Sequence, residues 1–325
     1  MPFAIYVLSS FFVSIRFQFA SFDNLIIKFF MNFLKYRYIS FIISGLLVGL
    51  AVFSLARFGL VLSLDFTGGS LLEVKLGQEA SSGDLWTAFE ENKVAVSQIQ
   101  ETQEGSFLIR FENDKSQEEI LAVLTENFGS VEKLRFETVS PTMGGELFTK
   151  ALTALVVAVA LILLYLSWRF KSYQFGVFAI LAMLHDALIL TGAFSLLGKA
   201  KGVGVDALFI TALLTTLSSS VHDTVVTFDY IRKQTGRFFS ADNLEEIANK
   251  ALNQTIVRNI NNSLTIIFML TAALLLGGET IRWFVVALLV GTILGTYSST
   301  FLAVPLLVTF EEWRRRRGKR PERTK

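Results

Sequence analysis

Six apolar runs of about 20 residues constrain the fold of this chain more than any other feature of its sequence. A helix of that length crosses the hydrocarbon core of a bilayer and satisfies its own backbone groups there. The composition agrees, because only 18% of the 325 residues are charged, whereas soluble domains carry about 25%. The sequence therefore predicts a polytopic α-helical membrane protein, with transmembrane helices over 39–62, 148–168, 174–197, 207–229, 256–276 and 282–309.

Lys and Arg residues in the short loops predict the orientation of these helices. They are frequent before the first helix, in the loops after the second and fourth helices, and after the sixth helix, at Lys28, Lys35, Arg37, Arg169, Lys171, Arg232, Lys233, Arg237, Lys250 and in the tail RRRRGKRPERTK. The opposite loops carry only Lys199, Lys201 and Arg282. We therefore expect both termini in the cytosol and the polar segment 63–147 outside it.

The polar segment 63–147 has the pattern of a small α+β domain. Ser116 and Glu119 have the spacing of a capping box at the start of its second helix. Alternating and amphipathic patterns predict, in chain order, strand 70–76, helix 82–93, strands 96–102 and 106–113, helix 116–128 and strand 131–140. This β-α-β-β-α-β order is the ferredoxin-like split pattern, so we expect one extracytoplasmic ferredoxin-like domain.

The remaining segments flank the five-helix transmembrane region 148–309. Residues 1–38 form a cytosolic N-terminal segment, in which 1–30 are either an upstream extension or a short interfacial segment. Residues 242–257 are amphipathic and predict a helix that lies at the membrane surface or leads into the fifth transmembrane helix. Residues 310–325 form a basic cytosolic tail. The positive-inside rule explains this tail without a nucleic-acid partner, and anionic membrane lipid is a further candidate for it.

Five ionisable side chains lie inside or against the apolar runs, where each costs about 2.5–3.5 kcal/mol. His222, Asp223 and Asp229 lie in the fourth run, Arg258 begins the fifth, and Asp186 lies in the middle of the third. Membrane proteins use such groups for protons, ions or substrates. We therefore regard all five residues as candidates for a proton relay.

Asp223 and Arg258 carry the main hypothesis, because the end of the fourth helix and the start of the fifth lie on one side of the membrane. We expect an ion pair between them, with Asp223 as proton carrier. The alternatives are a structural salt bridge for Asp223 and a snorkelling, interfacial role for Arg258. Asp229 also suits an interfacial or capping carboxylate, and Asp186 suits a structural hydrogen-bonded role.

The composition limits other chemistry. Cysteine is absent, which excludes disulfides, thiolate metal sites and cysteine nucleophiles. The two histidines and the acidic residues lack metal-ligand spacing, and no Gly-rich nucleotide-binding loop is present. We expect neither an enzyme nor a bound cofactor.

Small residues predict close helix packing in two places. Gly45 and Gly49 in the first helix have the G-x-x-x-G spacing, as do Gly291 and Gly295 in the sixth. We expect these faces to pack within the chain rather than between copies of it.

Several motifs resemble those of the SecF family, membrane subunits of the bacterial protein-export machinery. The resemblance covers about 31–310 and rests on LDFTGGSLLE, VSPTMGGEL, LAMLHDALI, VHDTVVTFDYIRK, LNQTIVRNINNSLT and the last apolar run. It implies a relation to the RND transporter superfamily, pairing with SecD and association with the SecYEG channel. It also implies that the proton-motive force helps to draw precursor proteins across the bacterial cytoplasmic (inner) membrane.

The family's membrane carboxylate falls on Asp223, and its fifth-helix arginine falls on Arg258. The chain departs from the family at His222, where Asn is usual, and in the stretch RNINNSLT. These changes leave the coupling ion open between proton and sodium. We hypothesise that His222 moves the operating pH; an unchanged pH–activity profile in His222→Asn would count against this. The rival functions are a passive scaffold for the translocase and half of an RND-type solute exporter.

Overall fold

A computed structural model describes residues 32–318 except 79, 102–104, 112–116, 171–172 and 236–243. The predicted segment 1–30, the capping residue Ser116 and the end of the basic tail lie outside the described residues. The chain divides into two compact units. The first unit comprises Met1–Gly49, Ile162–Leu188 and Thr215–Lys325, and the second comprises Leu50–Leu161 and Ile189–Leu214.

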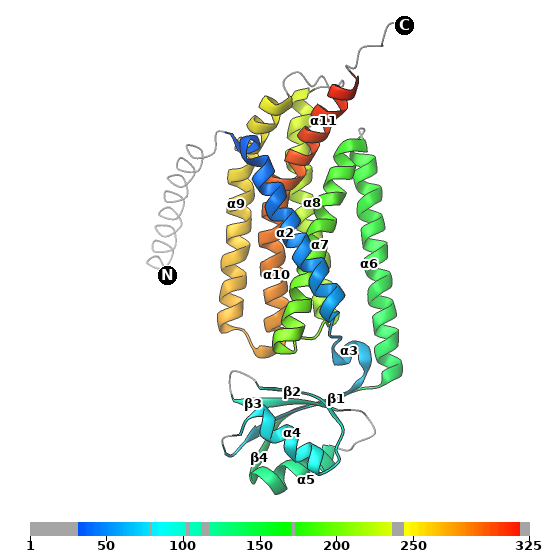
Figure 1. Ribbon diagram of the computed structural model, residues 1–325, viewed down its shortest axis with the longest axis vertical. Coiled ribbons are helices and arrows are strands. Elements are labelled where there is room, and N and C mark those ends of the chain that lie inside the picture. Colours follow the sequence, from blue (N-terminus) through cyan, green and yellow to red (C-terminus); the bar gives the residue numbers. More distant parts are fainter. Residues whose placement is uncertain are drawn as a thin grey trace, which may run out of the picture. The chain divides into compact units, whose positions relative to one another are not determined.

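The elements are labelled in Figure 1. The strands are β1 (Gly69–Leu76), β2 (Val96–Glu101), β3 (Ser106–Phe111) and β4 (Val131–Val139). The helices are η1 (Phe33–Tyr36), α2 (Arg37–Phe58), α3 (Leu64–Thr67), α4 (Ser82–Glu91), α5 (Gln117–Phe128), α6 (Pro141–Arg169), α7 (Tyr173–Lys201), α8 (Ala207–Thr235), α9 (Leu244–Leu276), α10 (Glu279–Ser298), η3 (Ser299–Ala303, a π-helix) and α11 (Val304–Gly318).

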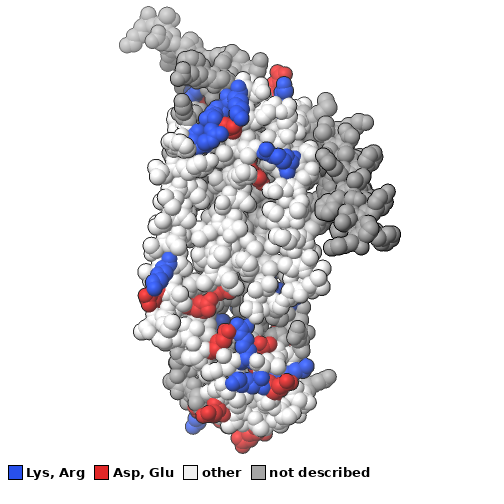
Figure 2. Space-filling view, turned by 180° about the vertical axis from the view of Figure 1, so that it is seen from behind, with Lys and Arg blue, Asp and Glu red and all other residues white. Residues whose placement is uncertain are grey.

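Five helical segments of the described chain are long and apolar enough to cross a membrane. They are η1 with α2, then α6, α7 and α9, and the continuous run α10–η3–α11. Figure 2 shows the same character on one face, where a broad region of the surface carries few charged side chains. α8 matches the 29-residue length of α7 but is less apolar, because the polar stretch SSSVHDT lies within it.

The first transmembrane helix ends earlier than the predicted 39–62. α2 ends at Phe58 because Gly59 adopts a left-handed backbone conformation, with φ of +69°. The chain then runs extended beside Val205, whose backbone N–H donates to the Val61 carbonyl at 2.7 Å and whose carbonyl accepts from the Ser63 N–H at 2.9 Å. The last turn of the predicted helix is thus replaced by a short segment that pairs with Val205.

Two other helices are longer than predicted. α6 begins at Pro141 rather than at 148, since proline suits the first helical turn. α9 joins the amphipathic segment 242–257 to the fifth transmembrane helix, because neither Gly nor Pro interrupts Leu244–Leu276. Of the two predictions for that segment, the one in which it leads into the helix is confirmed.

The sixth predicted helix contains a π-helical turn between α10 and α11. Pro305 follows this turn, and a proline cannot donate its backbone nitrogen to the carbonyl four residues earlier. That carbonyl belongs to Phe301, inside η3. Proline therefore explains why the backbone widens here while the helix continues through Arg317.

β1 lies inside a four-stranded antiparallel sheet of order β2-β3-β1-β4. α4 and α5 pack against it (Figure 1), so the predicted β-α-β-β-α-β order is confirmed. Strands and helices together form a core that includes Leu72, Val74, Leu85, Phe89, Ile109, Ile120 and Leu124. A capping box starts α4, where Ser81 and Asp84 exchange hydrogen bonds.

Glycines shape the entry to this domain. Gly68 and Gly69, with φ of +73° and +117°, turn the chain from α3 into β1. A Cβ at Gly69 would lie 3.0 Å from the Phe111 carbonyl oxygen, and a Cβ at Gly144 would lie 2.8 Å from the Gly68 nitrogen. The motifs LDFTGGSLLE and VSPTMGGEL therefore contact each other through glycine.

Candidate functional site

One face of α8 carries polar side chains into the first unit. Ser220, Asp223 and Thr227 share this face by their helical spacing, and all three are buried. Gly295 of α10 lets the helices approach, since a Cβ there would lie 3.1 Å from the Cβ of Ser220. His222 lies outside this buried face and is exposed.

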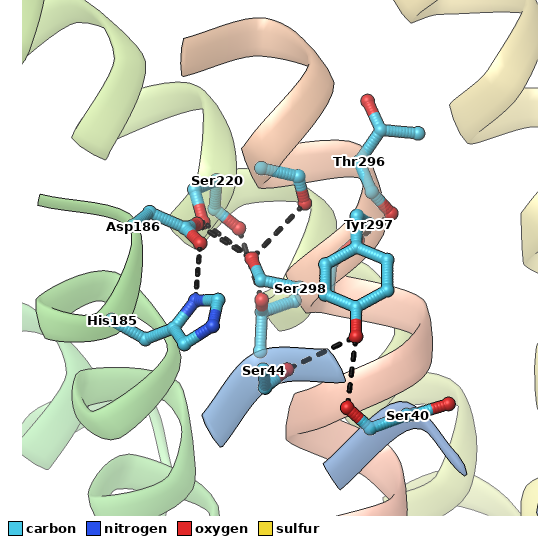
Figure 3. A network of polar contacts seen from close by, with 11 residues as sticks. Ser40, Ser44, His185, Asp186, Ser220, Thr296, Tyr297 and Ser298 are labelled. Atoms are coloured by element: carbon cyan, nitrogen blue, oxygen red, sulfur yellow. Dashed lines mark hydrogen bonds and ion pairs between the residues drawn. The ribbon is translucent and has the colours of Figure 1, made fainter. Parts of the chain in front are cut away.

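Asp186 of α7 is the centre of a buried hydrogen-bond network (Figure 3). Its Oδ2 accepts from the hydroxyls of Ser220 at 2.6 Å and Ser298 at 2.5 Å. Its Oδ1 lies 2.9 Å from Nδ1 of His185. Three neighbours from three helices thus satisfy this carboxyl group, which is the arrangement a buried polar group requires.

A second set of hydrogen bonds joins Tyr297, the neighbour of Ser298, to α2. The hydroxyl of Tyr297 donates to the Ser40 carbonyl at 3.0 Å and lies 3.0 Å from Oγ of Ser44. Ser298 is the last residue of α10, so the network ends where the π-helical turn begins. Such π-helical turns are frequent at functional sites.

Asp223 lies on the same face of α8, one turn beyond Ser220, and is 7% exposed. Its carboxylate has no hydrogen bond or ion pair to any residue that the structure describes, although His222 and Arg258 are close enough to interact with it electrostatically. The predicted ion pair between Asp223 and Arg258 is therefore not formed in this structure. α8 and α9 instead meet through the hydroxyls of Thr227 and Thr255, 3.1 Å apart.

Arg258 is exposed and lines a cavity of about 370 Å³ between the C-terminal ends of α6 and α8 and the interior of α9. Asp229 lines the same cavity and forms ion pairs with three cations, Arg169 at 2.9 Å, Arg232 at 2.6 Å and Lys233 at 3.0 Å. These contacts match the interfacial role considered for Asp229. Arg258 takes no part in these three ion pairs. It lies directly before the polar stretch of the fifth predicted helix.

The structure brings Asp186 and Asp223 to neighbouring turns of one helix pair, whereas Asp229 and Arg258 line the cavity that also contains Arg169 and Lys233. Sequence reasoning identified Asp186 but missed the residues that hold it, His185, Ser220 and Ser298. The available signal was a histidine beside a mid-helix aspartate. Among the described residues, no group of three or more His, Cys, Asp or Glu side chains could hold a metal ion.

Two family models match the chain. The model described as "Protein export membrane protein SecD/SecF, C-terminal" matches residues 119–313, and the "SecD/SecF GG Motif" matches residues 53–80. The second range contains Gly68 and Gly69, whose turn is described above.

Relatives named protein translocase subunit SecF are similar over most of their length. The relative from Anaerolinea thermophila is 38% identical over 305 residues, which cover 90% of this chain and 99% of that protein. The relative from Thermobaculum terrenum is 37% identical over 86% of this chain and 94% of that protein. The relative from Synechocystis is 35% identical over 87% and 95%, respectively.

Two solved structures of SecDF are similar in fold. The crystal structure of SecDF from Thermus thermophilus, titled a translocon-associated membrane protein, matches with a TM-score of 0.76 and 33% identity over 86% of this chain. SecDF in a super-membrane-facing form matches with a TM-score of 0.64 and 32% identity over 88% of this chain. This chain spans only 38% and 39% of those two chains.

Proposed function

The chain belongs to the SecD/SecF family of protein-export membrane proteins and has the accessory role of a Sec translocase subunit, and we propose that it couples the proton-motive force to export. In this proposal it acts with SecD at the SecYEG channel on translocating precursor proteins. The titles of the similar structures, which name SecDF and the translocon, support these partners. Membrane lipid is the remaining partner, and no nucleic acid is involved.

The proposal rests chiefly on the surroundings of Asp223. It is a buried carboxyl group without a hydrogen bond or ion pair to the described residues. Arg258 is close enough to interact with it electrostatically. We assign Asp223 as proton carrier and Arg258 as the charge that resets it. Asp186, Asp229 and His222 are further members of the proposed relay, and protons rather than sodium are the coupling ion.

The energetics of this coupling are sufficient. One proton crossing 100 mV releases about 2.3 kcal/mol. A tenfold change in an equilibrium needs about 1.4 kcal/mol. A single proton per step can therefore bias a two-state movement of the chain by more than tenfold.

The proposal includes a topology for this multi-pass inner-membrane protein. α8 spans the membrane in addition to the five apolar segments, which makes six transmembrane helices; both termini are cytosolic, and the sheet domain is extracytoplasmic and ferredoxin-like. The positions of Lys and Arg in the loops and the strand order β2-β3-β1-β4 support this topology.

A solute exporter is the weaker alternative. The pocket on the sheet domain lined by Leu71, Gln98, Gln100, Leu108 and Arg110 has a volume of about 90 Å³. Pockets for drug-sized ligands have about 300–1,000 Å³. A passive scaffold is the second alternative, and the following experiment separates it from the proposal.

Precursor export into inverted vesicles with ATP tests the proposal. Wild type and Asp223→Asn are compared with and without an uncoupler, after equal assembly with SecD is verified. We expect Asp223→Asn to lose the gradient-dependent part of export and to keep the ATP-dependent part. Asp206→Asn, which changes a carboxyl group in the loop before α8, is the matched control and should respond as wild type does. Equal responses of Asp223→Asn and wild type would establish the scaffold instead.

A further inference from the structure

We propose that His185 is a second proton-binding residue of the membrane helices, held in position by Asp186, Ser220 and Ser298. Its use in export rests on the proposed function, whereas the binding of a proton does not. The site takes a proton at the imidazole, not a metal ion or a solute. It differs from the relay above because the titrating group is a histidine on α7.

The first observation is an unpartnered nitrogen. The His185 side chain is 7% exposed, and its Nδ1 lies 2.9 Å from Asp186 Oδ1. Its Nε2 is buried and has no hydrogen-bond partner among the described residues. Buried polar atoms are normally satisfied, and an exception is explained by a functional role or by an ordered water. Nε2 is therefore the atom at which we expect the proton to bind and leave.

The second observation is the arrangement around the carboxyl group. Asp186 accepts two hydroxyl hydrogen bonds on Oδ2, which leaves Oδ1 directed at the imidazole (Figure 3). An ionised carboxylate so placed balances the charge of a protonated imidazole. The pair then carries no net charge in an apolar surrounding, where an isolated charge is costly.

The elements packed around the pair add few other titratable groups. Tyr297 of α10 has its ring 6.5 Å from the His185 ring. α8 contributes Asp223, one turn from Ser220, and α2 contributes the Ser40 carbonyl and the Ser44 hydroxyl, both of which contact the Tyr297 hydroxyl. Among these described neighbours Asp186 is thus the carboxyl group in direct contact with the imidazole, and Asp223 is the next one along α8.

The third observation links the site to elements that can move. Ser298 ends α10 immediately before the π-helical turn, and Ser220 lies one turn from Asp223. A change in the charge of the His185–Asp186 pair alters the hydrogen bonds that Asp186 Oδ2 accepts from Ser220 and Ser298. We infer that protonation at His185 is communicated to Asp223 through Ser220 and to η3 through Ser298.

Nitrogen NMR of histidine-labelled full-length chain in lipid nanodiscs tests proton binding directly. The chain contains two histidines, so His222→Asn assigns the two imidazole signals. We expect the His185 signal to change between its neutral and protonated forms as the pH is varied. Asp186→Asn should displace this change, because a charge in direct contact is removed. A His185 signal that stays in one form throughout would overturn the proposal.

Ser298 and Ser299 allow a matched test of whether Ser298 positions the His185–Asp186 pair. Ser298→Ala removes a hydrogen bond to Asp186, whereas Ser299→Ala changes an adjacent buried serine that donates only to the Thr296 carbonyl. We expect Ser298→Ala, and not Ser299→Ala, to displace the titration of His185. Equal titrations in both variants would overturn the positioning role. Titration of His185 in a chain whose export ignores the uncoupler would refute the proposed function and leave this site standing.

Discussion

Three carboxyl groups in the helices of the first unit have three different surroundings. Asp186 is hydrogen-bonded by two serines and a histidine, and Asp229 is paired with three cations. Asp223 has neither kind of contact among the described residues. Nearby cations and hydrogen bonds to the oxygens stabilise the ionised form of a carboxyl group. Asp223 lacks these contacts, which is why we assign the carrier to Asp223.

A fourth carboxyl group gives a prediction on pH. Asp206 precedes α8 and caps it, because the Phe209 N–H donates to its Oδ1 at 2.6 Å. Burial raises the pKa of Asp206, partly opposed by that hydrogen bond, and the nearby charge of Asp65 raises it further. Since the folded-state pKa lies above the ordinary one, the stability contributed by Asp206 is present at acid pH and is lost as the pH rises through the raised pKa.

We therefore expect Asp206→Asn to be at least as stable as wild type at neutral pH. Asparagine caps a helix as well as aspartate does, and it carries no charge into the buried position. Thermal unfolding in detergent at several values between about pH 4 and pH 7 measures this. A variant less stable than wild type at neutral pH, with an unchanged pH dependence, would contradict the argument.

Single residues also mark the limit of sequence reasoning. The cost of a charge in an apolar helix identified Asp186 and Asp223 without any structure. It could not identify Ser220 and Ser298, which lie 34 and 112 residues from Asp186 in the chain. Serine is common in helices, and only the packing of α7, α8 and α10 makes these two serines part of a site.

At the scale of elements, the two G-x-x-x-G faces have different roles. A Cβ at Gly291 would clash with the side chain of Thr216, and one at Gly295 would approach Ser220. Packing within the chain is therefore confirmed for α10. A Cβ at Gly45 or Gly49 would meet nothing within 4 Å. Among the described residues, the predicted close packing within the chain is therefore not found at the α2 glycines.

This contrast predicts opposite outcomes for the same substitution. Gly291→Leu should destabilise the chain by about 1–3 kcal/mol, because it overpacks the contact between α8 and α10. Gly45→Leu is the matched control and should leave stability unchanged. Thermal unfolding of the purified chain in detergent compares them. Equal melting temperatures for the two variants would show that the α8–α10 contact is not tight.

Element boundaries were predictable where local chemistry decides them. The periodic strands and helices of the sheet domain are found close to their predicted ranges. α2 is an exception, because its end depends on Gly59 and on pairing with Val205, far along the chain. The π-helical turn is another, since Pro305 alone does not specify how a helix accommodates it.

At the scale of the whole molecule, the apolar runs predicted a membrane protein, and the element order predicted the sheet domain. The strand order β2-β3-β1-β4 could not be read from periodicity, because the β1–β4 pairs join residues such as Ser70 and Thr138. Six transmembrane helices were predicted. α8 is long enough to be one of them, but it is not apolar enough to be among the five candidate spans. The same polar residues that lower its hydropathy form the candidate site.

The central claim is that protons pass through this chain by way of Asp223 as precursor proteins move. Proton flux in sodium-free proteoliposomes containing the chain, SecD and SecYEG measures this directly, with a trapped pH-sensitive dye and precursor present. We predict that wild type dissipates an imposed proton gradient faster than Asp223→Asn does, and that Asp206→Asn behaves as wild type. Equal dissipation by wild type and Asp223→Asn, or a wild-type flux that appears only when sodium is added, would contradict the claim.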